Sequence, residues 1–387
     1  MLQMDNTIDK DFFAFGDDDI INIVFFSSGD FGIPTLKALI EEKRYHIKGI
    51  VTSNDKVVYN DKRILDIAKE NDIPCCIPSN EEELYSFLEP IKDTESEFGD
   101  NLYYCVISYK KLSDRILSLV KGRAMNVHAS ILPFLRGAAP INWAIRLGFK
   151  QTGLAAFKLT DKIDQGDVFS AIAVDINENE TYDSLFEKLS NKCVDFTMGS
   201  LNIFSIACMT DSGWSRQPNI GIKSELLEAP KITTKYWDGW LNLSMDEIDR
   251  LFRSTSNGLP CKLYIIERDK TEPCAVFDAK IWDYEFIPNL EEGSEGVNWY
   301  PTECDGKHYI RVAFGEQVEK VMSIKEIQLS GKKKMGIEEF LRGFKYTRNN
   351  EGNYRLTISS NLILSNIIEL ILYGRGRKED NNKEYRL

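Results

Sequence analysis

The first half of the chain alternates short apolar runs with amphipathic stretches. The runs at 21–26, 47–52, 102–109 and 124–127 are largely apolar, which is typical of strands covered on both faces. Stretches between them, such as 63–71, carry apolar residues at helical spacing. Strands that alternate with helices imply right-handed crossovers. We therefore predict an α/β fold with a Rossmann-like, mostly parallel sheet.

The pattern changes in the second half of the chain. From about 211 to 229 the periodicity is lost and Gly, Ser, Pro and Gln accumulate, which is typical of an interdomain linker. Four short β runs follow farther on, at 262–266, 275–282, 309–314 and 319–327. Short strands with a helix beside them favour a small β-barrel, of the OB-like kind.

Two sequence signals mark expected helix starts. Ser79 with Glu82, and Ser244 with Glu247, have the spacing of a capping box, in which each side chain satisfies a free backbone N–H of the first turn. A third helix is expected to open at Pro140, because proline fits the first helical position.

Length and patterning together suggest several parts. A chain of 387 residues with 43% hydrophobic content can bury a large core and can form two or more domains. We expect an acidic extension, a catalytic domain, a linker, an OB-like domain and a carboxyl-terminal extension, at 1–20, 21–208, 209–229, 230–346 and 347–387.

Charge is distributed unevenly along the chain. The net charge of −12 argues against a general nucleic-acid binder. Residues 1–20 carry six Asp and one Lys, whereas 307–387 carry 16 Lys and Arg against 10 Asp and Glu, a net of +6. The basic end therefore favours a local contact with RNA.

Composition indicates a cytoplasmic protein. The acidic start has the wrong sign for a mitochondrial transit peptide and lacks the apolar core of a signal peptide. No apolar run approaches the roughly 20 residues that span a bilayer, so we expect no membrane partner. The eight cysteines include no C-x-x-C and only three histidines occur, so neither a disulfide framework nor a metal site is expected.

Polar side chains gather where one apolar run ends. Asn126, His128 and Ser130 alternate along this run, and a period of two puts them on one face of a strand. Open α/β sheets build their sites at the carboxyl ends of strands, next to such glycine-containing loops. A His beside an Asn can also be a satisfied core pair, and the spacing alone leaves both interpretations open.

Ordered motifs extend this cluster. Asn126-x-His128-x-Ser130-Ile-Leu-Pro133 is followed by Arg136-Gly-Ala-Ala-Pro-Ile141, Thr152-Gly153 and Asp164-x-Gly166-Asp167. These blocks resemble the folate-dependent formyltransferases and, within that family, most of all the methionyl-tRNA formyltransferases. The resemblance continues through 229–232, 329–335 and 339–341, so it covers roughly residues 21–343.

The resemblance implies a formyltransferase fold, 10-formyltetrahydrofolate as the formyl donor and initiator methionyl-tRNA as the acceptor. It implies that Asn126, His128 and Asp164 are catalytic. The residues expected to line the folate site are Ser130, Ile131, Leu132, Pro133, Ile107 and Tyr109.

Formyl transfer needs stabilisation of an oxyanion and movement of protons. A protonated His128 and the Asn126 amide could both donate to the oxyanion, and one such donor is worth roughly 2.7–4 kcal/mol. Asp164 could accept a hydrogen bond from His128 and favour the imidazolium, or pass protons through water. In Asp-x-Gly, Asp164 could instead be a turn residue. Ser130 lacks the G-x-S-x-G setting of a nucleophile.

Basic residues could hold the acceptor. Arg136 could meet a phosphate of the acceptor or the folate tail, or be a solvated surface residue. Lys332, Lys333 and Lys334 could contact tRNA phosphates, or form a solvated turn. The loop at 53–63 is shorter than in the methionyl-tRNA enzymes and lacks their Gly- and Arg-rich character, so recognition of the acceptor stem could be relaxed or lie elsewhere.

Two other functions compete with this interpretation. A sugar-nucleotide N-formyltransferase would share Asn, His and Asp, but the basic block at 330–334 disfavours it. An RNA- or folate-binding protein without catalysis would not need all three of Asn126, His128 and Asp164. A monomer is the expected state.

Overall fold

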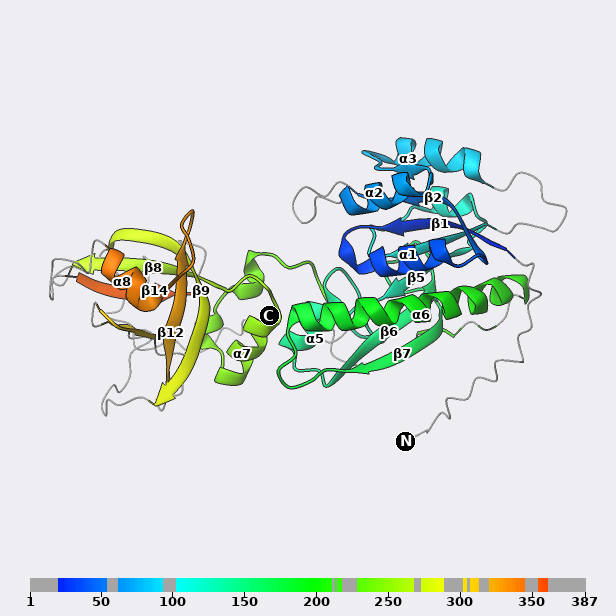
Figure 1. Cartoon of the computed structure of the whole chain (residues 1–387). Coiled ribbons are helices and arrows are strands. Elements are labelled where there is room, and N and C mark those ends of the chain that lie inside the picture. Colours follow the sequence, from blue (N-terminus) through cyan, green and yellow to red (C-terminus); the bar gives the residue numbers. More distant parts are fainter. Residues whose placement is uncertain are drawn as a thin grey trace, which may run out of the picture. The chain divides into compact units, whose positions relative to one another are not determined.

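The chain divides into an amino-terminal unit, Met1–Lys231, and a carboxyl-terminal unit, Ile232–Leu387 (Figure 1). In this computed structural model the described residues are 20–53, 62–92, 102–210, 213, 215–217, 228–267, 273–288, 302–304, 307–312, 320–344 and 354–360. Most of the expected linker and loop at 53–63, nearly all of the acidic extension, and 361–387 lie outside them.

A seven-stranded sheet forms the centre of the amino-terminal unit, in the order β3-β2-β1-β4-β5-β6-β7. The strands from β3 to β5 pair in parallel, whereas β6 runs antiparallel to β5 and β7 antiparallel to β6. The predicted α/β fold with a mostly parallel sheet is therefore confirmed. The strands are β1 (Ile21–Ser27), β2 (Tyr45–Val51), β3 (Cys75–Cys76), β4 (Leu102–Ile107), β5 (Ala124–His128), β6 (Gln151–Lys158) and β7 (Val168–Asp175).

Helices cover both faces of this sheet, which explains why its inner strands are largely apolar. Ile23 and Phe25 of β1 pack on one face, with α1, α2 and α6. Val24 and Phe26 point the other way, into a core with α3 and α4. The helices are η1 (Asp30–Gly32), α1 (Ile33–Glu41), α2 (Lys62–Glu70), α3 (Glu81–Leu88), η2 (Glu89–Ile91), α4 (Asp114–Ser118), α5 (Pro140–Arg146) and α6 (Tyr182–Thr210).

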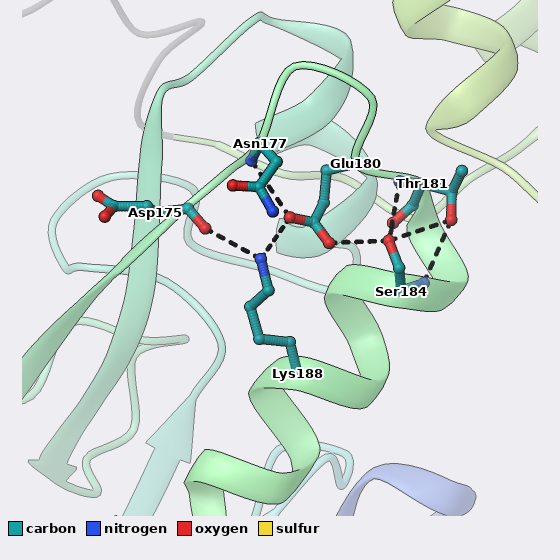
Figure 2. A network of polar contacts seen from close by, with 6 residues as sticks. All are labelled: Asp175, Asn177, Glu180, Thr181, Ser184 and Lys188. Carbon is teal, nitrogen blue, oxygen red and sulfur yellow. Dashed lines mark hydrogen bonds and ion pairs between the residues drawn. The ribbon is translucent and has the colours of Figure 1, made fainter.

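A polar network around the buried carboxylate of Glu180 joins the start of the long helix α6 to the end of β7 (Figure 2). Glu180 accepts hydrogen bonds from Ser184 Oγ at 2.8 Å and from the Asn177 N–H at 3.2 Å. Lys188 forms an ion pair with the same carboxylate and donates to the Asp175 carbonyl at 3.3 Å. Burial raises the pKa of Glu180, but the bonds from Lys188, Ser184 and Asn177 outweigh burial and hold the pKa below its usual value.

The helix-start predictions had different outcomes. Ser244 and Glu247 form the expected capping box. The box expected at Ser79 is wrong by one residue, because Asn80 caps α3 and accepts from the Glu83 N–H at 2.9 Å. Asn is as good a cap as Ser. With Asn80 as the N-cap, the residue three positions farther on is Glu83 rather than Glu82, and the Glu83 carboxylate accepts the Ser79 N–H at 2.8 Å.

The carboxyl-terminal unit is built on an antiparallel sheet in the order β10-β11-β12-β9-β8-β14, with β13 paired to β12. The outer strands β10 and β14 also contact each other, so the sheet curls toward a barrel, as the OB-like prediction requires. The elements are η4 (Thr234–Trp237), η5 (Trp240–Asn242), α7 (Met245–Arg253), β8 (Leu259–Glu267), β9 (Pro273–Pro288), β10 (Thr302–Cys304), β11 (Ile310–Val312), β12 (Lys320–Leu329), β13 (Met335–Gly336), α8 (Ile337–Gly343) and β14 (Tyr354–Ser359).

Within the described part of the chain, none of the helices combines the length and the apolar character needed to cross a membrane.

Candidate active site

His128 stands at the carboxyl end of β5, where that strand pairs with β4 on one side and β6 on the other. The residue is 7% exposed, and its Nε2 lies 2.8 Å from the backbone carbonyl of Leu135. A carbonyl oxygen can only accept, so Nε2 carries the proton of this hydrogen bond. The opposite nitrogen, Nδ1, faces Asp164.

Asp164 is also buried, at 9% exposure, and its carboxylate is oriented by backbone. Oδ2 accepts the Gly137 N–H at 2.7 Å and lies 3.7 Å from His128 Nδ1. That separation is an ion-pair distance, so the direct hydrogen bond expected between the two side chains is not formed. The carboxylate therefore lies where it would stabilise positive charge on the ring.

Asn126 lies two residues before His128 on the same strand. Its Oδ1 is buried and has no hydrogen-bond partner among the residues that the structure describes. A buried polar atom without a partner costs about 1–3 kcal/mol, and such an atom in a cluster of polar side chains points to a ligand group that completes it.

The loop after β5 is held closely against this pair. Leu135 adopts a left-handed conformation, with φ of 56°, although the residue is only 1% exposed. Strain of this kind persists where surrounding contacts impose it, and here the same residue supplies the carbonyl that binds His128. Ser130 Oγ donates to the Phe134 carbonyl at 2.6 Å, so its hydroxyl is engaged by the loop itself.

The residues expected to line the folate site lie at and just after the end of β4 and in the loop after β5. Leu132 is buried against Ala155 and Phe157, and Ile107 is fully buried in the core, so neither side chain is displayed to a ligand. Tyr109 differs, because its hydroxyl is buried without a partner in the described chain. Burial raises the pKa of Tyr109 above its ordinary value, so the hydroxyl stays protonated.

Arg136 is turned toward the protein. Its Nε and Nη2 both donate to Gln217 Oε1, at 3.0 and 2.6 Å, and its carbonyl accepts the Ala229 N–H at 2.6 Å. Sequence reasoning missed Gln217 altogether, because it lies in a stretch whose composition indicated only a linker. The position of Arg136 within an ordered motif was the one signal that could have led to its partner.

Lys332, Lys333 and Lys334 belong to the carboxyl-terminal unit, in the turn between β12 and β13, and all three are exposed. Lys334 pairs with Glu326 at 2.8 Å and lies over the Trp282 ring, 5.4 Å from its centroid. The three lysines therefore form an exposed basic turn in which the charge of Lys334 is partly compensated.

The amino-terminal unit thus gathers Asn126, His128, Arg136 and Asp164 around one strand end and two loops. In the described ranges of the chain there is no group of three or more His, Cys, Asp or Glu side chains that could hold a metal ion.

Comparisons with known proteins agree with this architecture. The family model described as formyl transferase matches residues 21–196, and that described as formyl transferase, C-terminal domain, matches 239–345. The methionyl-tRNA formyltransferase of Pediococcus pentosaceus is 28% identical over 338 residues, covering 83% of this chain and 94% of the relative. That of Bacillus thuringiensis subsp. konkukian is 29% identical over 336 residues, covering 84% and 96%.

Among solved structures, an N-formyltransferase from Helicobacter canadensis, in complex with folinic acid and dTDP-3-aminofucose, matches with a TM-score of 0.51. The match covers 79% of this chain and 99% of that chain at 14% identity, so it shows the shared fold alone.

Proposed function

The chain belongs to the formyl transferase family, and we propose that it transfers the formyl group of 10-formyltetrahydrofolate to the amino group of initiator methionyl-tRNA. The observation that carries the proposal is the buried pair of His128 and Asp164 beside the unpartnered amide oxygen of Asn126. Methionyl-tRNA formyltransferases that match along nearly their whole length support this choice of acceptor.

The residues at the ends of β4 and β5 fit a folate. Asn126 Oδ1 and the Tyr109 hydroxyl are buried and lack partners in the described chain, so each can take a hydrogen bond from the ring or amide groups of a folate. When bound, the folate supplies the formyl group. Ser130, Ile131, Pro133 and Tyr109 are proposed to hold it, and the buried Leu132 and Ile107 support them from the core.

His128 is proposed to stabilise negative charge on the formyl oxygen. Its Nε2–H is committed to the Leu135 carbonyl, whereas Nδ1 makes no hydrogen bond to Asp164 at 3.7 Å and is the ring atom left to donate to substrate. The Asn126 amide nitrogen provides a second donor. Each donor of this kind contributes about 2.7–4 kcal/mol to transition-state stabilisation.

Asp164 is proposed to have two roles. Its carboxylate faces Nδ1, where it would stabilise positive charge that develops on the ring. One oxygen, Oδ2, is held by the Gly137 N–H, and Oδ1 makes no hydrogen bond within the described residues. That second oxygen can take the proton that the attacking amine loses, directly or through water, and return it to the leaving nitrogen.

The carboxyl-terminal unit is proposed to hold the tRNA. Exposed Lys332 and Lys333 carry charges that form no ion pair among the described residues, and Lys334 lies beside an aromatic ring. Such a turn can neutralise phosphates as point charges.

A direct assay tests the proposal. The purified chain is given 10-formyltetrahydrofolate with a labelled formyl group and, in parallel, initiator methionyl-tRNA or an amino-sugar nucleotide. Label appearing in the methionyl-tRNA supports the proposal. Label appearing only in the sugar nucleotide would assign the chain to sugar formylation, and no transfer to either acceptor would contradict both activities.

A further inference from the structure

The segment after α6 returns to the site and forms hydrogen bonds with it at three places. Ser215 exchanges two backbone hydrogen bonds with Val168 at the start of β7, at 2.8 and 3.0 Å. Ala229 donates to the Arg136 carbonyl and accepts from the Ala139 N–H at 3.1 Å. Between these two anchors lies Gln217, whose side chain is partly buried.

Gln217 joins the two loops of the active site through its amide. Its Nε2 donates to the carbonyls of Asp164 and Gly166, at 2.8 and 2.9 Å. Its Oε1 accepts both Nε and Nη2 of Arg136. These hydrogen bonds all lie within the amino-terminal unit.

Chemistry fixes the orientation of this amide. A guanidinium can only donate and a carbonyl can only accept, so the oxygen of Gln217 must face Arg136 and the nitrogen must face the loop. Both N–H groups of the amide are used, one for each carbonyl. No other uncharged side chain of this length offers one acceptor and two donors in this arrangement.

The loop that Gln217 holds has little conformational freedom. Asp164 is left-handed, with φ of 49°, a conformation that Asp tolerates better than most residues. At Gly166 an added Cβ would lie 1.7 Å from the Lys158 carbonyl oxygen, so the backbone there packs too closely for any side chain. The bonds from Gln217 fix the carbonyls on either side of this turn.

We propose that Gln217 is a positioning residue, which sets the Asp164 carboxylate against His128 by joining the 164–166 backbone to Arg136. Arg136 adjoins Gly137, whose N–H binds Asp164 Oδ2. The Gln217 amide therefore links the 164–166 backbone, which carries the carboxylate, to the 136–137 segment, whose Gly137 N–H orients it. This inference rests on the proposed function, because it concerns the rate of formyl transfer.

Two substitutions separate this role from a simpler one. Gln217→Glu keeps an acceptor for Arg136 and adds an ion pair, but it removes both donors and turns a carboxylate toward two carbonyl oxygens. Gln217→Ala removes every hydrogen bond of the amide. If Gln217 only anchored Arg136, the Glu variant would keep activity, whereas positioning of Asp164 predicts that both variants lose it.

The expected loss is in kcat. A displacement of the order of 1 Å at a catalytic group can cost about 10²-fold, so we expect kcat of both variants to fall by about 10- to 100-fold, with little change in KM for either substrate. Gln151→Ala is the matched control. Gln151 also bonds across the same unit, to Asp175 Oδ1 at 2.7 Å, but within the described chain it forms no hydrogen bond with a residue of the site. Circular dichroism verifies that each variant is folded.

A double-mutant cycle makes the test specific. In an Asp164→Asn background the carboxylate is already gone, so adding Gln217→Ala should lower kcat by less than about twofold if Gln217 acts through that group. An equal loss in both backgrounds, or wild-type kcat in the Gln217→Glu variant, would overturn the proposal. If the wild type formylates only the sugar nucleotide, the cycle is run with that acceptor, so failure of the proposed tRNA activity is seen separately.

Discussion

Replacing Lys188 with Met should destabilise the amino-terminal unit, because it leaves the Glu180 carboxylate buried without its cation. Glu180 is 5% exposed, and the Lys188 side chain retains 28% exposure. Removing one partner of a buried pair costs about 3–5 kcal/mol. Ser184 and the Asn177 N–H still bind Glu180 in the variant, so we expect a loss of about 2 kcal/mol, nearer the cost of an incompletely satisfied buried group.

The loss should also depend on pH, with a defined sign. The folded-state pKa of Glu180 lies below its unfolded value, so the stability it contributes is present above about pH 4.3 and is lost as pH falls through the folded value. In the Lys188→Met variant the bond that lowers the pKa of Glu180 is gone, so burial raises that pKa. The difference between wild type and Lys188→Met should therefore be largest near neutral pH and should shrink in acid.

Urea denaturation followed by far-ultraviolet circular dichroism, at several pH values, measures both effects. Lys192→Met is the control, because Lys192 is exposed one turn farther along the same helix and has no ion pair in the described chain. Equal stabilities of the Lys188 and Lys192 variants at neutral pH, or a difference that grows in acid, would refute the reasoning.

Three further predictions concern the site and its partners. Asp164→Asn keeps an acceptor for the Gly137 N–H but removes the charge that faces His128, and formyl transfer should fall by about 10²-fold in the folded variant; an unchanged rate would exclude an electrostatic role. Changing Lys332, Lys333 and Lys334 together to Ala should weaken tRNA binding and flatten its salt dependence, by about one log–log unit for each phosphate that is no longer neutralised, while sparing transfer at saturating tRNA. Unchanged affinity and slope would leave the cluster a solvated turn. Chelators should leave the rate of transfer unchanged, and a fall in rate that zinc restores would contradict this.

The parts of the site that sequence predicted are those encoded by short-range pattern. The alternation along one apolar run predicts Asn126 and His128 at the end of a strand, and in the structure both lie in the last three residues of β5. The apolar strands of the inner sheet also followed directly, since burial on both faces leaves a continuous run.

The parts that sequence did not predict depend on contacts between distant segments. The Gln217 amide meets Arg136 and Asp164 only after α6 has crossed the sheet, and no local pattern records such a meeting. For Arg136 the sequence leaves open a contact with the acceptor or the folate and a solvated surface position. Its internal partner was a neutral side chain that periodicity cannot identify.

The capping box at Ser79 shows a finer limit. Ser and Asn are both good caps, and adjacent candidates with three consecutive glutamates after them cannot be ranked by propensity. In the structure Asn80, with an extended backbone (φ −151°, ψ 177°), takes the N-cap position.

Transfer of labelled formyl from 10-formyltetrahydrofolate to initiator methionyl-tRNA, compared between the wild type and a folded His128→Ala variant, tests the central claim most directly. The account predicts transfer by the wild type and a loss of about 10²-fold or more in the variant, because His128 supplies the charge that stabilises the oxyanion. Wild-type turnover by folded His128→Ala would remove His128 from the mechanism, and absence of transfer by the wild type would contradict the proposed activity itself.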